Sequence, residues 1–380
     1  MRKLLYLVVI GLLIVSCGSR QTPVDAEGDT LRMKYAEHIE MIRYGQLTKV
    51  VLKNPWKAGE VLHTYWLVQR GNSLPQQLEG TGADVVSVPL QKAVVFNTAH
   101  AWLTITLGAL TQVRGVADLR FMQLPAVRQR VQSGLTADCG DAMSPNIEQI
   151  IDLDADAILL SPFENSGGYG RLEKLGIPLI ECADYMETSA LGRAEWMKFY
   201  GMLFGKEREA DSLFHVVDSS YQVLKARAAQ CGTEGAKAPR LITEKLTGST
   251  WYVPGGRSSV GRLIADANGS YPWADDKHSG SLALPFETVF DKAGDADVWL
   301  FNDFRDQPMT YQRLAAEYRG YPLMKAFRDR RVWYVNSLKV PYFEEVSFRP
   351  DWLLLDYIRM LHPELGLGEP KYYKKLNDEL

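Results

Sequence analysis

The chain has few of the residues that mark a metal centre or a disulfide scaffold. Its 380 residues include four cysteines and six histidines. No Cys-x-x-Cys pair occurs, so the cysteine spacing does not predict a zinc site. Cys139, Cys182 and Cys231 form an odd set at long spacings. An oxidising compartment would permit one disulfide, for which Cys139–Cys182 is the pair to test, and buried free thiols are the alternative.

An excess of positive charge is also missing. The 43 basic and 46 acidic residues give a formal net charge of −3, and no block of like charge stands out. Proteins that bind nucleic acid present a basic surface to the phosphates, so we expect no nucleic-acid partner.

Enzyme motifs are equally scarce. Neither G-x-S-x-G nor H-E-x-x-H occurs, and the glycine-rich stretch 255–261 lacks the Gly-Lys-Ser/Thr of a P-loop. We therefore expect no enzymatic activity and no cofactor. A hydrolase with paired carboxylates stays open as an alternative, because any Asp and Glu can converge in a fold.

The N-terminus is the most informative segment that is present. Met1-Arg2-Lys3 precedes an apolar run from Leu4 to Val15, and Ser16-Cys17-Gly18 follows. This order predicts a secretory signal peptide over residues 1–16, whose apolar run is too short to span a bilayer. Ile14-Val15-Ser16-Cys17 resembles the lipobox of bacterial lipoproteins. The resemblance implies a lipid on Cys17, a polar tether over residues 17–30 and a mature chain anchored to a membrane outside the cytoplasm.

Beyond the tether, the hydrophobic pattern predicts an α/β protein. Short apolar runs such as Ala93–Phe96 and Ala157–Leu160 are typical of buried strands, and helical patterns alternate with them. This alternation predicts parallel sheets covered by helices. Residues 188–228 contain no proline and repeat apolar residues at helical spacing, which predicts a connecting helical segment. We thus expect an N-terminal lobe over 31–187 and a C-terminal lobe over 229–380.

Four stretches in a fixed order carry a family resemblance. They are 94–116 with its Leu-Gly-Ala turn, 145–159 with Pro-Asn-Ile-Glu, 175–178 with Leu-Gly-Ile-Pro, and 349–364. Together they resemble the substrate-binding proteins of ABC importers for iron complexes and vitamin B12. The resemblance implies two parallel-sheet lobes, a long connecting helix and a ligand cleft between the lobes. It covers about residues 93–363 and gives no role to residues 31–92.

The same resemblance implies partners. It implies a monomer that captures an iron complex (a siderophore or haem) or a cobalamin in the periplasm and delivers it to an ABC permease dimer in the inner membrane. In this family an acidic residue on each lobe docks on arginines of the permease, and the matching positions are Glu148 and Glu287. Both follow a proline at a predicted helix start, where an exposed Glu without a partner is also ordinary.

Ligands of such folds bind between the lobes, at the carboxyl ends of parallel strands. Loops that follow predicted strands supply the candidate ligand-binding residues: His100, Phe163, Glu164, Tyr169, Trp251, Tyr252, Arg257, His278, Asp303 and Arg305. Aromatic rings suit a flat conjugated ligand, and arginines suit an anionic chelate. Core packing of Trp251, surface exposure of the arginines and a simple hydrogen bond from His100 are the competing explanations.

Two further hypotheses stay open. A bare zinc, manganese or iron ion would need three or four ligands from both lobes, for which His100, Glu164, His278 and Asp303 are candidates. A receptor lipoprotein of the same fold that feeds an outer-membrane transporter would not dock on a permease through Glu148 and Glu287.

Overall fold

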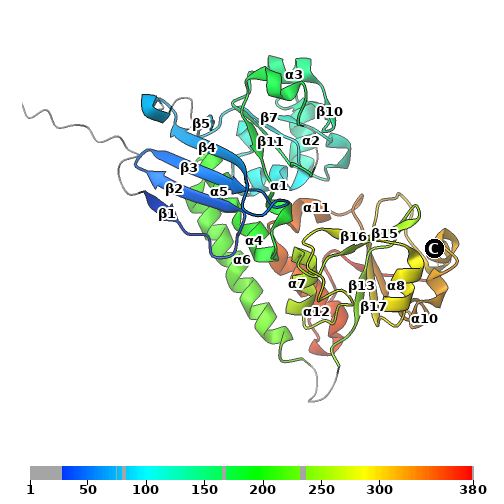
Figure 1. Cartoon of the computed structure of the whole chain (residues 1–380). Helices are drawn as coiled ribbons and strands as arrows, with labels where there is room; N and C mark the ends of the chain where they lie inside the picture. Colours follow the sequence, from blue (N-terminus) through cyan, green and yellow to red (C-terminus); the bar gives the residue numbers. More distant parts are fainter. Residues whose placement is uncertain (1–27, 74, 79–82, 165–167, 232–236, 379–380) are drawn as a thin grey trace, which may run out of the picture.

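The computed structural model describes residues 28–73, 75–78, 83–164, 168–231 and 237–378. The expected signal peptide, Cys17 and most of the expected tether lie outside the described residues, as do residues 165–167 in the loop after Phe163. Among the described residues, no helix is both long and apolar enough to cross a membrane. Two lobes and one additional sheet surround a central group of helices (Figure 1).

The first lobe contains a five-stranded parallel sheet in the order β12-β11-β6-β7-β8. Its strands are β6 (Ala93–Val95), β7 (Val113–Val116), β8 (Ala137–Asp138), β11 (Ala157–Leu160) and β12 (Leu179–Glu181). Every residue of β6 and β11 is buried, as expected of parallel strands covered on both faces. The helices of this lobe are α1 (Thr98–Thr106), α2 (Pro125–Gln132) and α3 (Ile147–Asp152), and a small hairpin joins β9 (Gly140–Asp141) to β10 (Ser144–Pro145).

The second lobe contains two sheets. Its main sheet has the order β13-β17-β18-β19, in which the first three strands are parallel and the last is antiparallel. These strands are β13 (Leu241–Thr243), β17 (Val298–Asp303), β18 (Val332–Asn336) and β19 (Lys374–Lys375). The antiparallel sheet consists of β14 (Leu246–Thr247), β15 (Thr250–Pro254) and β16 (Ser281–Leu284). The helices are α7 (Ser259–Asp266), α8 (Phe286–Ala293), α9 (Tyr311–Glu317), α10 (Lys325–Arg328), α11 (Tyr342–Glu345) and α12 (Pro350–Leu361).

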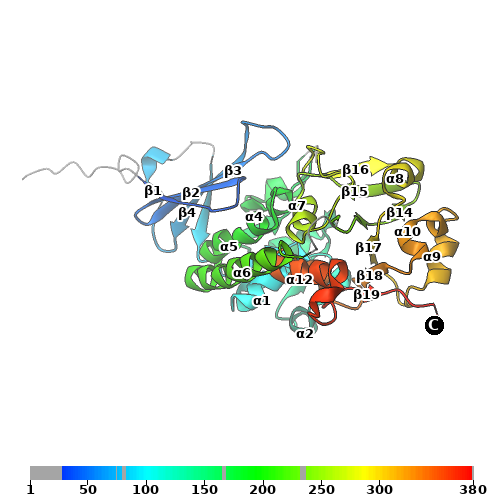
Figure 2. The ribbon, with the colours of Figure 1, turned by 90° about the horizontal axis from the view of Figure 1, so that it is seen from below.

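A run of three helices connects the lobes. These are α4 (Ala190–Glu195), α5 (Met197–Phe204) and the 22-residue α6 (Glu207–Ala228). Gly205 ends α5 at a φ of 65°, a left-handed conformation that glycine adopts at little cost. Helix α6 then runs from the first lobe to the second, with α12 beside it (Figures 1 and 2). The expected fold class, two parallel-sheet lobes joined by a long helix, is confirmed.

Residues 29–88 form a sheet of their own rather than joining the parallel sheet of the first lobe. It has the order β1-β2-β3-β4-β5 and consists of β1 (Asp29–Leu31), β2 (Ile39–Tyr44), β3 (Leu47–Lys53), β4 (Val61–Gln69) and β5 (Asp84–Val88). Two buried carboxylates attach its first connection to the central helices. Glu195 accepts the backbone N–H groups of residues 34–36, and Glu187 accepts those of residues 37 and 38. Charge-assisted bonds of this kind hold the sheet against α4.

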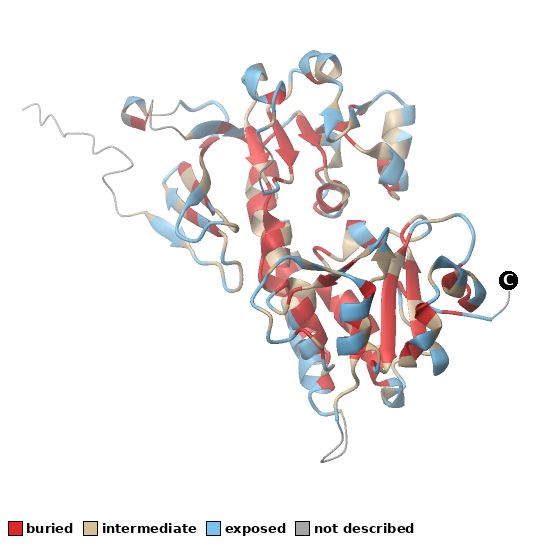
Figure 3. Cartoon of the chain, turned by 45° about the vertical axis from the view of Figure 1, so that its right-hand side comes forward, coloured by how far each residue is buried: buried red, intermediate tan, exposed pale blue. Residues whose placement is uncertain are grey.

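One continuous hydrophobic core extends from this N-terminal sheet through α5 and α6 into the second lobe. Figure 3 shows the buried residues running through the strands of both lobes and through the helices between them. The lobes are therefore joined by packed helices and not by a loop alone.

Cys139 and Cys182 are buried free thiols, so the disulfide that an oxidising compartment would permit is not formed. Cys139 follows β8 and Cys182 follows β12, which are the two outermost strands of the five-stranded sheet. Four strand spacings separate these edges by about 19 Å. A disulfide requires Cα atoms about 4.4–6.8 Å apart.

Candidate functional site

The loops that follow the parallel strands of the two lobes meet each other. Phe121, in the loop after β7, packs against Phe304, in the loop after β17, with ring centroids 5.7 Å apart and planes at 63°. Both rings remain about half exposed. The guanidinium of Arg120 lies 4.5 Å from the Phe121 ring and pairs with Asp141. The carboxyl ends of the two sheets therefore face a common space between the lobes.

The first lobe contributes an open pocket of about 580 Å³ to this region. Residues that follow β6, β7 and β11 line it, including Phe96, Asn97, Asp118, Phe163 and Tyr169, together with Met143 from the hairpin between β9 and β10. Asn97 accepts the N–H of Ala99 as the N-cap of α1, and its amide donates to Ser161. Asn97 thus fixes two pocket loops relative to each other.

The mouth of this pocket is apolar. Met143 is 74% exposed and Phe163 is 44% exposed. The Tyr169 hydroxyl donates to Glu181, which fixes the ring at the pocket wall. Desolvation, together with the Glu181 carboxylate, raises the pKa of Tyr169 above its ordinary value. Exposed apolar and aromatic side chains around a hollow are typical of a binding surface.

The corresponding strand ends of the second lobe carry charges that pair with one another. Lys245, after β13, lies 3.3 Å from Asp303 and 2.7 Å from Glu317. Arg305, after β17, pairs with the same two carboxylates. Asp303 is buried, and these two cations neutralise its negative charge inside the protein. The candidate pair Asp303 and Arg305 therefore forms one network, and its charges satisfy each other.

Glu344 of α11 joins the second lobe to the first. Its carboxylate accepts the N–H of Gln123 at 2.7 Å and the hydroxyl of Thr98 at 3.0 Å. Burial raises the pKa of the Glu344 carboxyl, although these two hydrogen bonds oppose the shift. This contact holds α11 against the start of α1 at the base of the space between the lobes.

Two candidate ligand-binding residues lie in the core instead. His100 is 1% exposed, and its Nε2 lies 2.9 Å from Asp184. Trp251 is fully buried, and its indole N–H donates to the carbonyl of Thr243. Neither ring is open to a ligand in this structure, because each has a protein partner and is enclosed by other side chains.

The remaining candidates are exposed. Glu164 lies on the loop after β11, and Tyr252 lies on β15. Arg257 precedes α7, and His278 pairs with Asp276 at 3.1 Å. The structure thus brings Phe163 and Tyr169 together at one pocket, and Asp303 and Arg305 together in one network. The four exposed candidates of this paragraph belong to neither group.

The hypothetical metal set does not converge. Its four members lie in different places. His100 is in the core, Asp303 is in the charge network of the second lobe, and Glu164 and His278 are on exposed loops. Within the described part of the chain, three metal-ligating side chains of the His, Cys, Asp and Glu types gather only at Cys231, His362 and Glu364. That group lies on the far side of the second lobe.

The two expected docking residues are both exposed. Glu148 occupies the first turn of α3, and Glu287 occupies the first turn of α8. Each lobe therefore presents one of them to solvent. Their role in docking stays a prediction.

The periplasmic binding protein family matches residues 93–337, which is more than half of the chain. The chain belongs to the periplasmic binding protein family. Proteins of this kind bind solutes for ABC transporters. The match begins just after the N-terminal sheet, so residues 29–88 are an addition to the part that the family describes.

Relatives and solved structures agree with this assignment. An uncharacterized lipoprotein of Methanocaldococcus jannaschii is 23% identical over 373 residues, covering 92% of this chain and 86% of that protein. A possible iron-binding periplasmic solute-binding protein of Staphylococcus epidermidis has a TM-score of 0.56 at 16% identity, covering 72% of this chain and 99% of its own. The molybdate periplasmic binding protein of a Haemophilus influenzae ABC transporter has a TM-score of 0.55 at 18% identity, covering 73% and 88%. At these identities the structures show a common fold.

Sequence reasoning missed three residues of this periplasmic binding protein that shape the space between its lobes. They are Phe121, Lys245 and Glu344. Phe121 and Lys245 follow the parallel strands β7 and β13, so their position after a strand was the available signal. No local pattern indicates that Glu344 contacts the first lobe, because its partners Thr98 and Gln123 are distant in sequence.

Proposed function

We propose that this periplasmic binding protein captures an iron complex (a siderophore or haem) or a cobalamin outside the cytoplasm and delivers it to an ABC importer. A lipid on Cys17 anchors it to the membrane, and Glu148 and Glu287 dock it on the permease. The observation that carries the choice of ligand is the first-lobe pocket with its apolar mouth, formed by Phe163, Tyr169 and Met143.

The size and lining of the pocket support a ligand larger than an ion. About 580 Å³ lies within the range of sites for small organic ligands. Aromatic side chains bind flat conjugated rings by stacking, and the polarisable thioether of Met143 adapts to irregular apolar surfaces. Asn97 and Ser161 add hydrogen-bonding groups at the floor. This combination matches an organic chelate with a polar centre.

A bare metal ion fits less well. Zinc, manganese and iron sites need three or four side-chain ligands within bonding distance of one point. Among the described residues that line the first-lobe pocket, the only carboxylate is Asp118, and no histidine or cysteine is present. A metal would therefore enter this pocket already held by its own ligands.

The first test is ligand capture by the soluble chain from Gly18 onward. Haemin, cyanocobalamin or a ferric hydroxamate siderophore should co-elute with the protein in gel filtration and give a visible absorption band. Phe163→Ala should weaken that ligand about tenfold through lost stacking. Val223→Ala is the control, because this exposed apolar side chain lies on α6, outside the pocket. Stoichiometric zinc or manganese binding in the cleft with no band from any chelate would overturn the proposal.

The second test concerns docking. Glu148→Lys and Glu287→Lys should each lower the ligand-dependent ATPase rate of the reconstituted importer while leaving ligand affinity unchanged, because charge complementarity fixes the docking register. Asp211→Lys, an exposed charge reversal on α6, is the control. Unaltered ATPase in the double variant would point instead to a receptor that does not engage this permease.

A further inference from the structure

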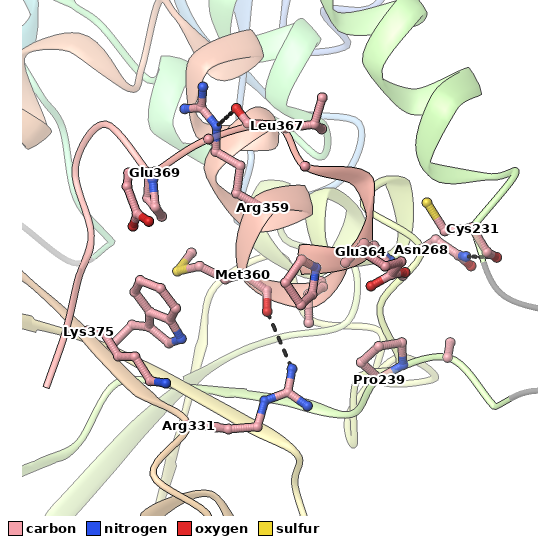
Figure 4. A pocket seen from close by; sticks show the side chains of 18 of the residues that line it. Cys231, Pro239, Asn268, Arg331, Arg359, Met360, Glu364, Leu367, Glu369 and Lys375 are labelled. Carbon is pink, nitrogen blue, oxygen red and sulfur yellow. Dashed lines mark hydrogen bonds and ion pairs between the residues drawn. The ribbon is translucent and has the colours of Figure 1, made fainter.

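A second and larger pocket lies at the opposite edge of the second lobe. Its volume is about 1060 Å³. Residues near the amino ends of β13 and β18 line it, together with the segments that follow α6 and α12. The carboxyl ends of those strands face the other lobe, so this pocket is separate from the proposed ligand site. Figure 4 shows Cys231, Asn268 and Glu364 close together in this pocket, with Arg331 and Lys375 across from them.

Three metal-ligating side chains converge in this pocket. The thiol of Cys231, a ring nitrogen of His362 and a carboxylate oxygen of Glu364 all lie within 4.8 Å of one another. Cys231 follows the end of α6, while His362 caps α12 and Glu364 lies in the next turn. The group therefore joins the connecting helix to the last helix of the second lobe. No local sequence pattern indicates this group, because Cys231 and His362 are far apart in the chain.

The surrounding bonds hold two of the three ligand residues. The backbone N–H of Cys231 donates to the carbonyl of Ala228, and its own carbonyl accepts the side-chain amide of Asn268 at 3.1 Å. His362 is 3% exposed, and its backbone N–H donates to Ile358. These contacts hold the backbone of Cys231 and of His362 in position, which helps to pre-arrange a metal site.

The orientation of the His362 ring is the most specific sign. Its Nε2 lies 3.0 Å from the carbonyl of Ala267 and must donate there, because a carbonyl only accepts. In the neutral ring, Nδ1 then carries a lone pair, and it lies 3.3 Å from Oε1 of Glu364. Either a proton on Nδ1 or a cation bound between the two atoms satisfies this contact, so the ring is oriented as a metal ligand would be. Metal-ligating histidines typically donate their other ring nitrogen to a carbonyl in this way.

We propose that Cys231, His362 and Glu364 bind Zn²⁺. Thiolate, imidazole and carboxylate are the three ligand types that zinc takes in proteins, at about 2.0–2.3 Å, so the ligand atoms of a tetrahedral site lie about 3–4 Å apart. The observed spacing needs only a small side-chain adjustment. Three protein ligands leave the fourth position to water or to a ligand in the pocket. The ion clamps the end of α6 to the end of α12.

Thiol protection tests this proposal on the chain from Gly18 onward. That chain has three cysteines, of which Cys139 and Cys182 are fully buried, so alkylation of the folded protein reports on Cys231. Zn²⁺ should slow this alkylation, and Co²⁺ should give a thiolate-to-metal charge-transfer band. Cys231→Ser should abolish the band, and Glu364→Gln should weaken Zn²⁺ binding at least about tenfold.

Glu369→Gln is the matched control, because Glu369 lines the same pocket and is outside the cluster. It should bind Zn²⁺ as the unchanged chain does. Equal melting temperatures of all variants without metal would show that they fold. Unprotected Cys231, no thiolate band, or equal losses in the Glu364 and Glu369 variants would each overturn the proposal. Capture of an iron complex is measured at the other pocket, so its failure would leave this result unaffected.

Discussion

The strand ends of the two lobes differ although they face the same space. In the first lobe they surround an open pocket whose rim carries Met143 and Phe163. In the second lobe they carry Lys245, Asp303 and Arg305, whose charges pair with one another and with Glu317. One side thus offers unoccupied apolar surface and hydrogen-bonding groups, whereas the other offers charges that already have partners.

This difference assigns separate tasks to the two lobes. A ligand gains apolar contact with the first lobe without displacing any protein group. An anionic ligand that engages Arg305 must compete with two carboxylates, and it would leave a buried Asp303 with fewer partners. The charges of the second lobe therefore form a surface that is held in place by its own ion pairs. We expect the main part of the ligand-binding free energy to come from the first lobe.

The largest effect is expected from Arg305→Met. This change removes one of the two cations that neutralise buried Asp303, which should lower the free energy of unfolding by about 2 kcal/mol. Urea unfolding measures it. Arg257→Met is the control, since its exposed guanidinium has no ion pair in the described structure, and we expect a change within about 0.5 kcal/mol. Equal effects of the two substitutions would mean that the charge network contributes nothing.

The next effect tests the first lobe. Asn97→Ala removes the N-cap of α1 and the bond to Ser161, and it should cost about 1 kcal/mol of stability and weaken ligand binding. Asn97→Asp retains the cap acceptor but loses the donor to Ser161. Its stability should stay near that of the unchanged chain while ligand affinity falls. An Asp variant with full affinity would show that the link between the two loops is not needed.

A third prediction concerns the contact between the lobes. Because the pKa of Glu344 is raised in the folded chain, its contribution to stability is present below the unfolded value of about 4.3 and is lost as pH rises through the raised folded pKa. Glu344→Gln lacks this titration. The difference in unfolding free energy between the two chains should therefore shift in favour of the variant as pH rises from about 4. A difference that does not vary with pH would contradict it.

The sequence predicted the lobes better than the site. Runs such as Ala157–Leu160 and Val298–Phe301 are strands in the structure, because a buried parallel strand needs a continuous apolar run. The N-terminal sheet was not distinguished from the first lobe. Its attachment depends on Glu187 and Glu195, whose backbone partners are some 150 residues away. Nothing local to either carboxylate indicates such a bond.

The candidate site shows the same limit. The rule that ligands bind after parallel strands selected Phe163 and Tyr169, which line the pocket. It also selected His100 and Trp251, which are buried. His100 lies in the first turn of α1 and faces the core, where its partner Asp184 is distant in sequence. Strand order indicates which loops gather, but side-chain direction depends on packing that a single sequence does not display.

The smallest expected effect probes the edge-to-face contact between Phe121 and Phe304, which spans the two lobes. A double-mutant cycle on Phe121→Ala and Phe304→Ala should give a coupling energy of about 0.5–1 kcal/mol, as for other edge-to-face pairs. The cycle is measured by unfolding with and without bound ligand. Coupling that grows with ligand would mean that the two rings close over it. A coupling near zero in both states would show that other contacts, such as those of Glu344, hold the lobes together without this ring pair, and the open first-lobe pocket would then be sufficient for capture.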